Sequence, residues 1–148
     1  MTVEEITDVT AEVIEAVGRL VPQLSRSARV PTDAEVAEIV RSPATVLLAA
    51  RSAGGGDGGG RIVGLLTLAL FRIPTGVRAW IEDVVVEESE RGKGVGEALI
   101  LESVRRAAAA GARTVDLTSR PSREAANRLY RRLGFAARET NVYRYESG

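Results

Sequence analysis

The sequence lacks cysteine and histidine altogether, and this removes several kinds of chemistry. Without cysteine the chain can form no disulfide and has no thiolate nucleophile. Without histidine it can build neither a Ser-His-Asp triad nor a His-ligated metal site, so we expect no bound metal. A general base must then be a carboxylate, a tyrosine, a lysine, the terminal amine or a relayed water. The absence of cysteine also suits a reducing compartment.

An excess of charge and a long apolar run are missing as well. Lys and Arg total 20 and Asp and Glu total 20, so the net charge is zero, whereas binding to duplex nucleic acid depends on an excess of basic residues. The longest apolar run, Ile62–Phe71, is shorter than the roughly 20 residues that span a bilayer. The first ten residues, MTVEEITDVT, are acidic where a signal peptide is basic. We therefore expect a soluble cytoplasmic protein with neither nucleic acid nor a membrane as a partner.

What the sequence does contain fits one ordinary domain. A chain of 148 residues with 45% hydrophobic residues can bury roughly 70% of its unfolded surface without a disulfide or metal. We therefore predict a single domain over residues 1–148. Glycine is frequent, and the segment AGGGDGGG at 53–60 is expected to be a flexible hairpin tip. It has no basic residue beside a helix start, so it is not expected to bind phosphate.

Apolar periodicity predicts an alternating order of helices and strands. Helices are expected at about 10–20, from Thr32 or Asp33 to Val40, from the glycine motif to Ala110, and from Pro121 or Ser122 to Gly134. Strands are expected at 45–50, 61–71, 77–86, 114–118 and 141–145. This order predicts a mixed α/β domain with a parallel crossover through the helix that follows the third strand.

The stretch ERGKGVGEALI, residues 90–100, is typical of a phosphate site. A helix start has unpaired N–H donors and a partial positive charge, so it favours anions. Gly92, Gly94 and Gly96 would let the backbone approach a ligand without interference from Cβ atoms. Arg91 and Lys93 add positive charge. The pattern therefore predicts that the turn into this helix holds a phosphate group.

Three common nucleotide motifs do not fit this stretch. A Walker loop requires Gly-Lys followed by Ser or Thr, but here Lys93 precedes Gly94. The dinucleotide fingerprint GxGxxG and the kinase glycine loop both fail at Glu97, which stands where the third glycine belongs. The pattern that does fit is Arg-x-x-Gly-x-Gly, formed by Arg91, Gly94 and Gly96.

Two longer segments resemble the GNAT N-acetyltransferases. IEDVVVEESERGKGVGEALILESV, at 81–104, is similar to that family's central strand, loop and helix, and EAANRLYRRLGF, at 124–135, is similar to a later family motif. Agreement is weaker over Val46–Phe71. The resemblance implies the GNAT fold, a central mixed β-sheet flanked by about four helices. It also implies acetyl-CoA as the cosubstrate.

The resemblance further implies a set of site residues. The strand around Val84–Val86 would pair with the pantetheine arm, the loop Arg91–Glu97 would hold the pyrophosphate, and Asn127 could contact the arm. The positions expected to contact the coenzyme are Val84, Val85, Val86, Arg91, Gly92, Lys93, Gly94, Val95, Gly96, Glu97, Asn127 and Tyr130.

Two residues are expected to act in catalysis. Tyr130 is the candidate general acid for the departing sulfur. Glu82 is the candidate base, acting directly or through a water, since alternation would place it on the same strand face as Val84 and Val86. Glu82 or Asp83 could instead be a structural ion-pair partner, and the sequence leaves both readings open.

The function implied is direct transfer of an acetyl group from acetyl-CoA to a primary amine in a ternary complex. The acceptor, a small molecule or a protein, is not specified by any motif. Dimers are common in the resembling family, so a homodimer is expected. The alternative is a non-catalytic acyl-CoA-binding regulatory module of the same fold, and a structural dimer with an empty pocket is a more distant one.

Overall fold

The computed structural model of the chain describes residues 1–54 and 59–148. Residues 55–58 lie outside the described part of the chain, and with them most of the expected glycine hairpin tip. The chain forms two compact units, Met1–Thr118 and Ser119–Gly148. The single domain expected over residues 1–148 stays a prediction.

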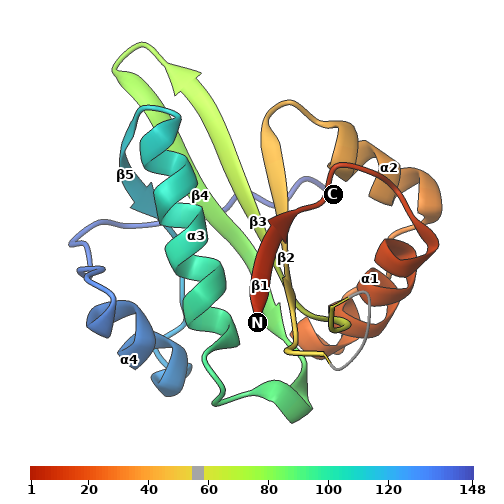
Figure 1. Ribbon diagram of the computed structural model, residues 1–148. Coiled ribbons are helices and arrows are strands. Elements are labelled where there is room, and N and C mark those ends of the chain that lie inside the picture. Colours follow the sequence, from red (N-terminus) through yellow and green to blue (C-terminus); the bar gives the residue numbers. More distant parts are fainter. Residues whose placement is uncertain (55–58) are drawn as a thin grey trace. The chain divides into compact units, whose positions relative to one another are not determined.

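The first unit is built on a five-stranded sheet in the order β1-β2-β3-β4-β5 (Figure 1). The strands are β1 (Thr2–Glu5), β2 (Thr45–Arg51), β3 (Ile62–Ile73), β4 (Gly76–Val86) and β5 (Ala112–Asp116). The first four strands pair antiparallel and β5 pairs parallel to β4. The predicted mixed sheet and its parallel crossover are therefore confirmed. The edge strand β1 was not predicted, because TVEE carries little apolar alternation.

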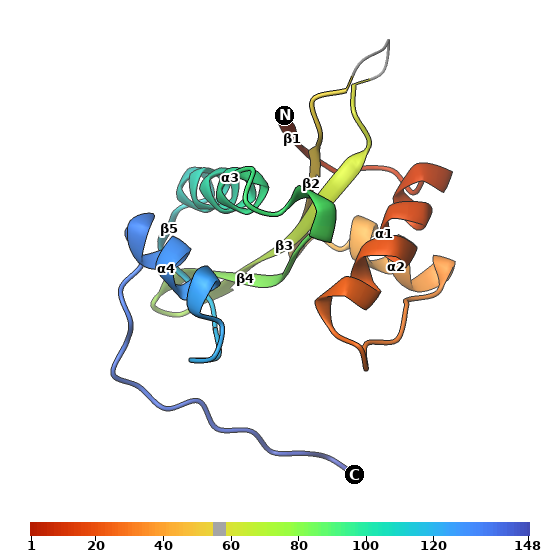
Figure 2. The ribbon, with the colours of Figure 1, turned by 90° about the horizontal axis from the view of Figure 1, so that it is seen from below.

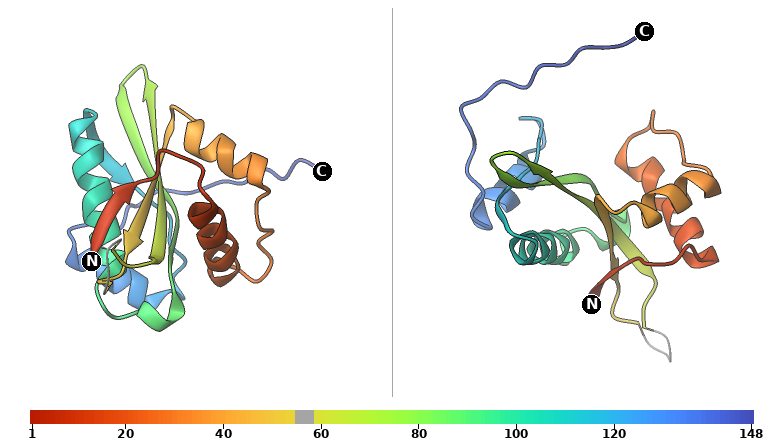
Figure 3. Two further views of the ribbon diagram at one scale, coloured as in Figure 1. Left: turned by 45° about the vertical axis from the view of Figure 1, so that its right-hand side comes forward. Right: turned by 90° about the horizontal axis from the view of Figure 1, so that it is seen from above.

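Helices cover both faces of this sheet. Helices α1 (Ala11–Leu24) and α2 (Asp33–Arg41) lie on one face and α3 (Val95–Ala109) lies on the other (Figures 2 and 3). Thr10 caps α1 by accepting from Val13 N at 3.2 Å. Thr32 caps α2 through a capping box with Glu35. The core includes the buried side chains of Val13, Ala16, Val17 and Leu20, which recur at helical spacing along α1.

Strand β4 departs from a regular ladder in two places. Leu65 pairs with Val85 and Thr67 pairs with Glu82, so β4 holds one more residue than β3 over this interval. This is a β-bulge at Asp83–Val84, and Asp83 has a positive φ of 49°. On the other side, the pairing with β5 ends at Trp80 opposite Asp116. Within the described chain, no strand pairs with that side of β4 over residues 81–86.

The second unit holds α4 (Glu124–Arg132), which ends before Gly134 at a φ of 100°. Residues 141–145 form no strand, so this prediction is wrong. Val142, Tyr143 and Tyr145 are largely exposed, and β-forming residues cannot form a ladder without a neighbouring strand. None of the described helices is long and apolar enough to cross a membrane.

Candidate active site

The turn between β4 and α3 presents an open backbone surface. After a short 3-10 turn, η1 (Glu88–Glu90), the chain passes through Gly92 at a φ of 80° and Gly94 at a φ of 85°. A Cβ atom added at either glycine would meet no heavy atom within 4 Å. Glycine is therefore required here by the left-handed backbone conformation, and the space in front of both residues is open.

The N-terminus of α3 faces this turn without a side-chain cap. Gly94 is the N-cap residue and offers no side-chain hydrogen bond. The first hydrogen bond of the helix runs from Ala98 N to Gly94 O at 3.0 Å, so the preceding amides have no acceptor within the helix. Val95 is buried beneath the turn and anchors it. Backbone donors at an uncapped helix start form a site for an anion.

Two cations flank the turn. Arg91 is exposed, and its backbone N–H donates to Glu88 O at 3.3 Å. Lys93 Nζ lies 3.2 Å from a carboxylate oxygen of Glu90. An exposed ion pair of this kind is worth little, so Lys93 could exchange Glu90 for a phosphate at small cost. Gly96 and Glu97, also expected at the phosphate, lie in the first turn of α3.

The unpaired side of β4 carries backbone groups directed away from β3. Glu87 N donates to Val63 O at 2.8 Å, so the amide of Glu87 faces β3. Because successive peptide groups of a regular strand point to opposite sides, the amide of Val86 faces the open side. The side chain of Val85 is buried, and Val85 pairs with Leu65. The expected position of the pantetheine arm therefore has a backbone donor at Val86, directed away from β3.

The bulge separates Glu82 from the face of Val86. Val86 pairs with Gly64, where a Cβ would come 2.9 Å from Val95 of α3, so this pair faces α3. Glu82 pairs with Thr67, which faces α1 and α2 as part of a cavity described below. The expectation that Glu82 and Val86 share a face is therefore wrong, because the extra residue reverses the alternation. Within the described residues, neither Glu82 nor Asp83 forms an ion pair, so the structural reading gains no support.

A buried carboxylate fixes the start of this turn, and sequence reasoning missed it. The side chain of Glu87 is 11% exposed and lies 2.6 Å from Arg19 Nη1 and 2.6 Å from Arg61 Nη2. Arg19 also donates to Ile62 O at 2.9 Å, and Gln23 of α1 accepts from Glu88 N at 2.9 Å. Arg19 and Glu87 are 68 residues apart, so no local pattern could have paired them.

In the second unit, Tyr130 and Asn127 make contacts of their own. The ring of Tyr130 packs against Phe135 with centroids 6.0 Å apart, and Phe135 N donates to Tyr130 O at 2.9 Å. Asn127 Nδ2 donates to Arg120 O at 3.0 Å and so holds the segment that precedes α4. Their roles toward the coenzyme and the thiolate stay predictions.

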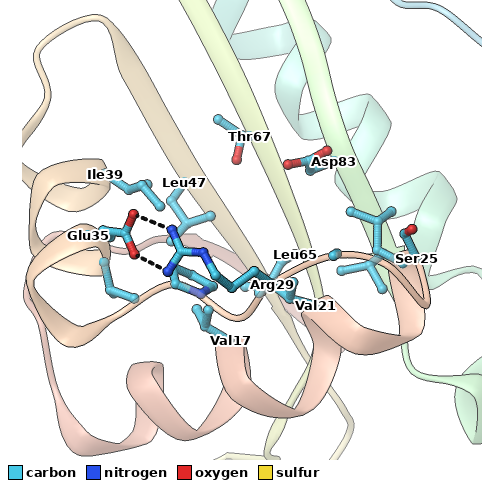
Figure 4. Close-up of a pocket in the computed structure, with 15 residues that line it drawn as sticks. Val17, Val21, Ser25, Arg29, Glu35, Ile39, Leu47, Leu65, Thr67 and Asp83 are labelled. Atoms are coloured by element: carbon cyan, nitrogen blue, oxygen red, sulfur yellow. Dashed lines mark hydrogen bonds and ion pairs between the residues drawn. The ribbon is translucent and has the colours of Figure 1, made fainter. Parts of the chain in front are cut away.

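A cavity of about 500 Å³ lies between α1, α2 and the sheet (Figure 4). Asp83, Thr67 and Val85 belong to its wall.

Among the described residues, no group of three or more acidic side chains gathers closely enough to hold a metal ion.

Comparisons with known proteins agree with this architecture. A family model described as the acetyltransferase (GNAT) family matches residues 24–135. No curated protein sequence matches the chain significantly.

Several solved structures are similar over nearly the whole chain. An acetyltransferase from Trypanosoma brucei is 25% identical with a TM-score of 0.77, and the match covers 98% of this chain and 99% of that one. A protein of Agrobacterium tumefaciens strain C58 reaches a TM-score of 0.84 at 21% identity, over 99% and 100% of the two chains. A protein designated AAC(6')-Iy, solved with the bisubstrate analogue CoA-S-monomethyl-acetylneamine, has a TM-score of 0.77 at 19% identity, over 99% and 98%. By the family match, which covers most of its length, this chain belongs to the GNAT acetyltransferase family.

Proposed function

We propose that this chain transfers the acetyl group of acetyl-CoA to a primary amine by direct attack within a ternary complex. The observation that carries this proposal is the uncapped start of α3, which is reached through Gly92 and Gly94 and adjoins the unpaired side of β4. One surface of backbone donors thus runs from a strand to a helix terminus. Such a surface suits a long ligand with an amide-rich arm and a diphosphate.

Each part of the surface has a proposed partner. The amides of the turn Arg91–Glu97 bind the pyrophosphate, helped by the charges of Arg91 and Lys93. The side of β4 formed by Val84–Val86 binds the pantetheine arm in the manner of an added strand. An N–H of this side donates to the thioester carbonyl, and this bond strengthens as negative charge develops on the oxygen.

The reaction must overcome the protonation of the amine. For an amine with a pKa near 10.4, removal of the proton at pH 7 costs about 4.6 kcal/mol. Glu82, through a water, is proposed to accept this proton. The neutral nitrogen then forms the C–N bond, the C–S bond breaks, and Tyr130 protonates the departing sulfur. The product nitrogen loses its second proton to water, and Tyr130 takes a proton back from water. Because the chain has no cysteine, we propose no acyl-enzyme intermediate. Asn127 is proposed to contact the pantetheine arm.

The test measures thiol release from acetyl-CoA across a panel of amines, together with thermal stabilisation by CoA. Gly94→Glu puts bulk and negative charge at the proposed pyrophosphate site and should abolish both signals. Gly111→Glu is the matched control, because Gly111 follows the other end of the same helix, has a φ of 93° and also has open space at its Cβ. Both variants carry similar backbone strain, and Gly111→Glu should keep CoA binding.

The outcomes separate the competing readings. Stabilisation by CoA without turnover on any amine would favour the non-catalytic acyl-CoA-binding module. No stabilisation by CoA would favour the structural dimer with an empty pocket. Tyr130→Phe should keep CoA affinity and lower turnover by roughly tenfold to a few thousandfold, within the range for positioned acids. The expected homodimer stays a prediction that sedimentation can test.

A further inference from the structure

The cavity beside β4 has the size and position of a site for a small organic molecule. Its volume of about 500 Å³ falls within the range of about 300–1,000 Å³ that is typical of ligand sites. Every residue of its wall belongs to the first unit, and they come from α1, the segment after it, α2 and strands β2 to β4. Val85 lines the cavity, and the amide of its neighbour Val86 faces the open side of the same strand.

Apolar side chains form most of the wall. They include Val17, Val21, Ile39, Leu47, Leu65 and Val85. Binding of a ligand that fills this space would be driven chiefly by the removal of apolar surface from water.

Two of the charges in the wall neutralise each other. The guanidinium of Arg29 donates to both carboxylate oxygens of Glu35, at 3.2 and 3.0 Å (Figure 4). Hydrogen bonds from the Thr32 backbone and from Arg29 lower the pKa of Glu35 to about 2, so this carboxyl stays charged at neutral pH. Glu35 thus has partners within the protein, whereas Asp83, the third charged residue of the wall, forms no ion pair with the described residues.

Asp83 occupies an unusual backbone position. Among the described residues it is the one non-glycine with a positive φ, at 49°. A residue in this region costs of order 1 kcal/mol or more relative to ordinary strand geometry, although Asp tolerates it better than most. A bulge commonly redirects a side chain, and here it brings the carboxylate into the cavity wall together with the Thr67 hydroxyl. Figure 4 shows these two groups on one side of the cavity, away from the Arg29–Glu35 pair.

We propose that this cavity binds the acceptor and that the acceptor is a primary amine on an uncharged apolar body, with its ammonium group held by Asp83. This proposal rests on the proposed function. The side chain of Asp83 is exposed and can be reached by a ligand, and Asp83 directly precedes Val84 at the proposed acetyl position. A polycationic, polyhydroxylated acceptor would instead need many polar partners, which this apolar wall does not offer.

The first experiment compares acceptors. Linear alkylamines of increasing length, phenethylamine and the aminoglycoside sisomicin are tested as substrates with acetyl-CoA. We expect kcat/KM to rise by about fourfold per methylene, equivalent to about 0.8 kcal/mol, until the cavity is full, and to be lowest for sisomicin. Val21→Phe, which fills part of the cavity, should shift the preferred chain length downward. Turnover that is best with sisomicin and insensitive to chain length would overturn the proposal.

The second experiment tests Asp83 by binding, so that it does not depend on turnover. Phenethylamine and the neutral 2-phenylethanol are titrated by calorimetry into protein loaded with CoA. Asp83→Asn keeps the shape and tolerates the left-handed conformation, and it should weaken phenethylamine at least tenfold while leaving phenylethanol and CoA unchanged. Glu38→Gln removes an exposed carboxylate of α2 outside the cavity and is the control.

These results distinguish the two proposals. Asp83-dependent binding of phenethylamine without thiol release would refute the proposed function and keep the amine site. Thiol release with equal binding of amine and alcohol in both the original protein and Asp83→Asn would keep the function and refute the amine site. If no amine binds to the CoA-loaded protein, the amine site is also refuted.

Discussion

The buried carboxylate of Glu87 offers a sharp test of how the first unit holds the turn between β4 and α3. We consider Glu87→Gln, which keeps the size of the side chain and removes its charge. In the structure this charge meets Arg19, whose side chain is 19% exposed, and Arg61, whose side chain is 58% exposed. After the substitution, Arg19 keeps its contacts with Glu15 and Ile62 O but loses its most buried anionic partner.

The two lost ion pairs differ in expected magnitude. A hydrogen bond to a charged group in a partly buried setting contributes about 1.5–3 kcal/mol, and this range applies to Arg19. The pair with the exposed Arg61 contributes less than about 1 kcal/mol. We therefore expect Glu87→Gln to lower the free energy of unfolding by about 2–3 kcal/mol. For a chain of this length, that corresponds to a decrease in Tm of roughly 4–12 °C.

The matched control is Glu15→Gln, which removes the other carboxylate from the same arginine. Glu15 is 61% exposed and lies 2.9 Å from Arg19 Nε, one helical turn away. The loss of Glu15 should lower the free energy of unfolding by less than about 1 kcal/mol. In 1 M salt, Glu15→Gln should be as stable as the original protein, because exposed charges are screened. Urea unfolding measures both variants at low and high salt. If the two variants lose equal stability, or if salt removes the effect of Glu87→Gln, the burial argument fails.

Three further predictions concern helix caps, pH and packing. Thr32→Ala should lower the free energy of unfolding by about 1 kcal/mol in urea, because it removes the N-cap of α2. Since the pKa of Glu35 is lowered to about 2, its stabilising effect is present above its unfolded pKa near 4.5 and is lost as the pH falls toward 2; Glu35→Gln should flatten the acid limb of the stability profile there. Gly64→Ala should cost about 1–3 kcal/mol in thermal unfolding, because its Cβ would meet side chains of α3 at 2.9 and 3.0 Å, whereas Gly18→Ala, with open space in α1, should be neutral or stabilising.

The elements that the sequence predicted well are those with strong local signals. The apolar spacing from Val13 to Leu20 is repeated over several turns, and Thr32 with Glu35 forms a capping box within four residues. Both signals depend only on residues close in sequence, so the helices they predict do not depend on how the rest of the chain folds. By contrast, residues 141–145 contain the β-forming residues Val142, Tyr143 and Tyr145 but form no strand, because a strand is stabilised by a neighbour that the segment itself cannot supply.

The bulge at Asp83 shows a second limit. A run such as IEDVVV is equally compatible with a regular ladder and with one that contains an extra residue, and a shift of one residue changes the face of every side chain beyond it. The choice is made by the pairing of β3 with β4, which matches Leu65 to Val85 but Thr67 to Glu82. As a result, alternation gave the wrong relation between Glu82 and Val86, and it gave no reason to place Asp83 in the cavity wall.

The two halves of the candidate site therefore differ in how far the sequence reveals them. The proposed phosphate half consists of backbone amides from consecutive residues. The glycines and the helix start that it requires are adjacent in the sequence, at 91–97. The proposed acceptor half is made by side chains from α1, α2 and three strands, which only the fold brings together. A site built from backbone leaves a short motif, whereas a site built from distant side chains leaves none. For this reason a motif can indicate a donor such as acetyl-CoA, while the acceptor has to be inferred from the shape and charge of a cavity.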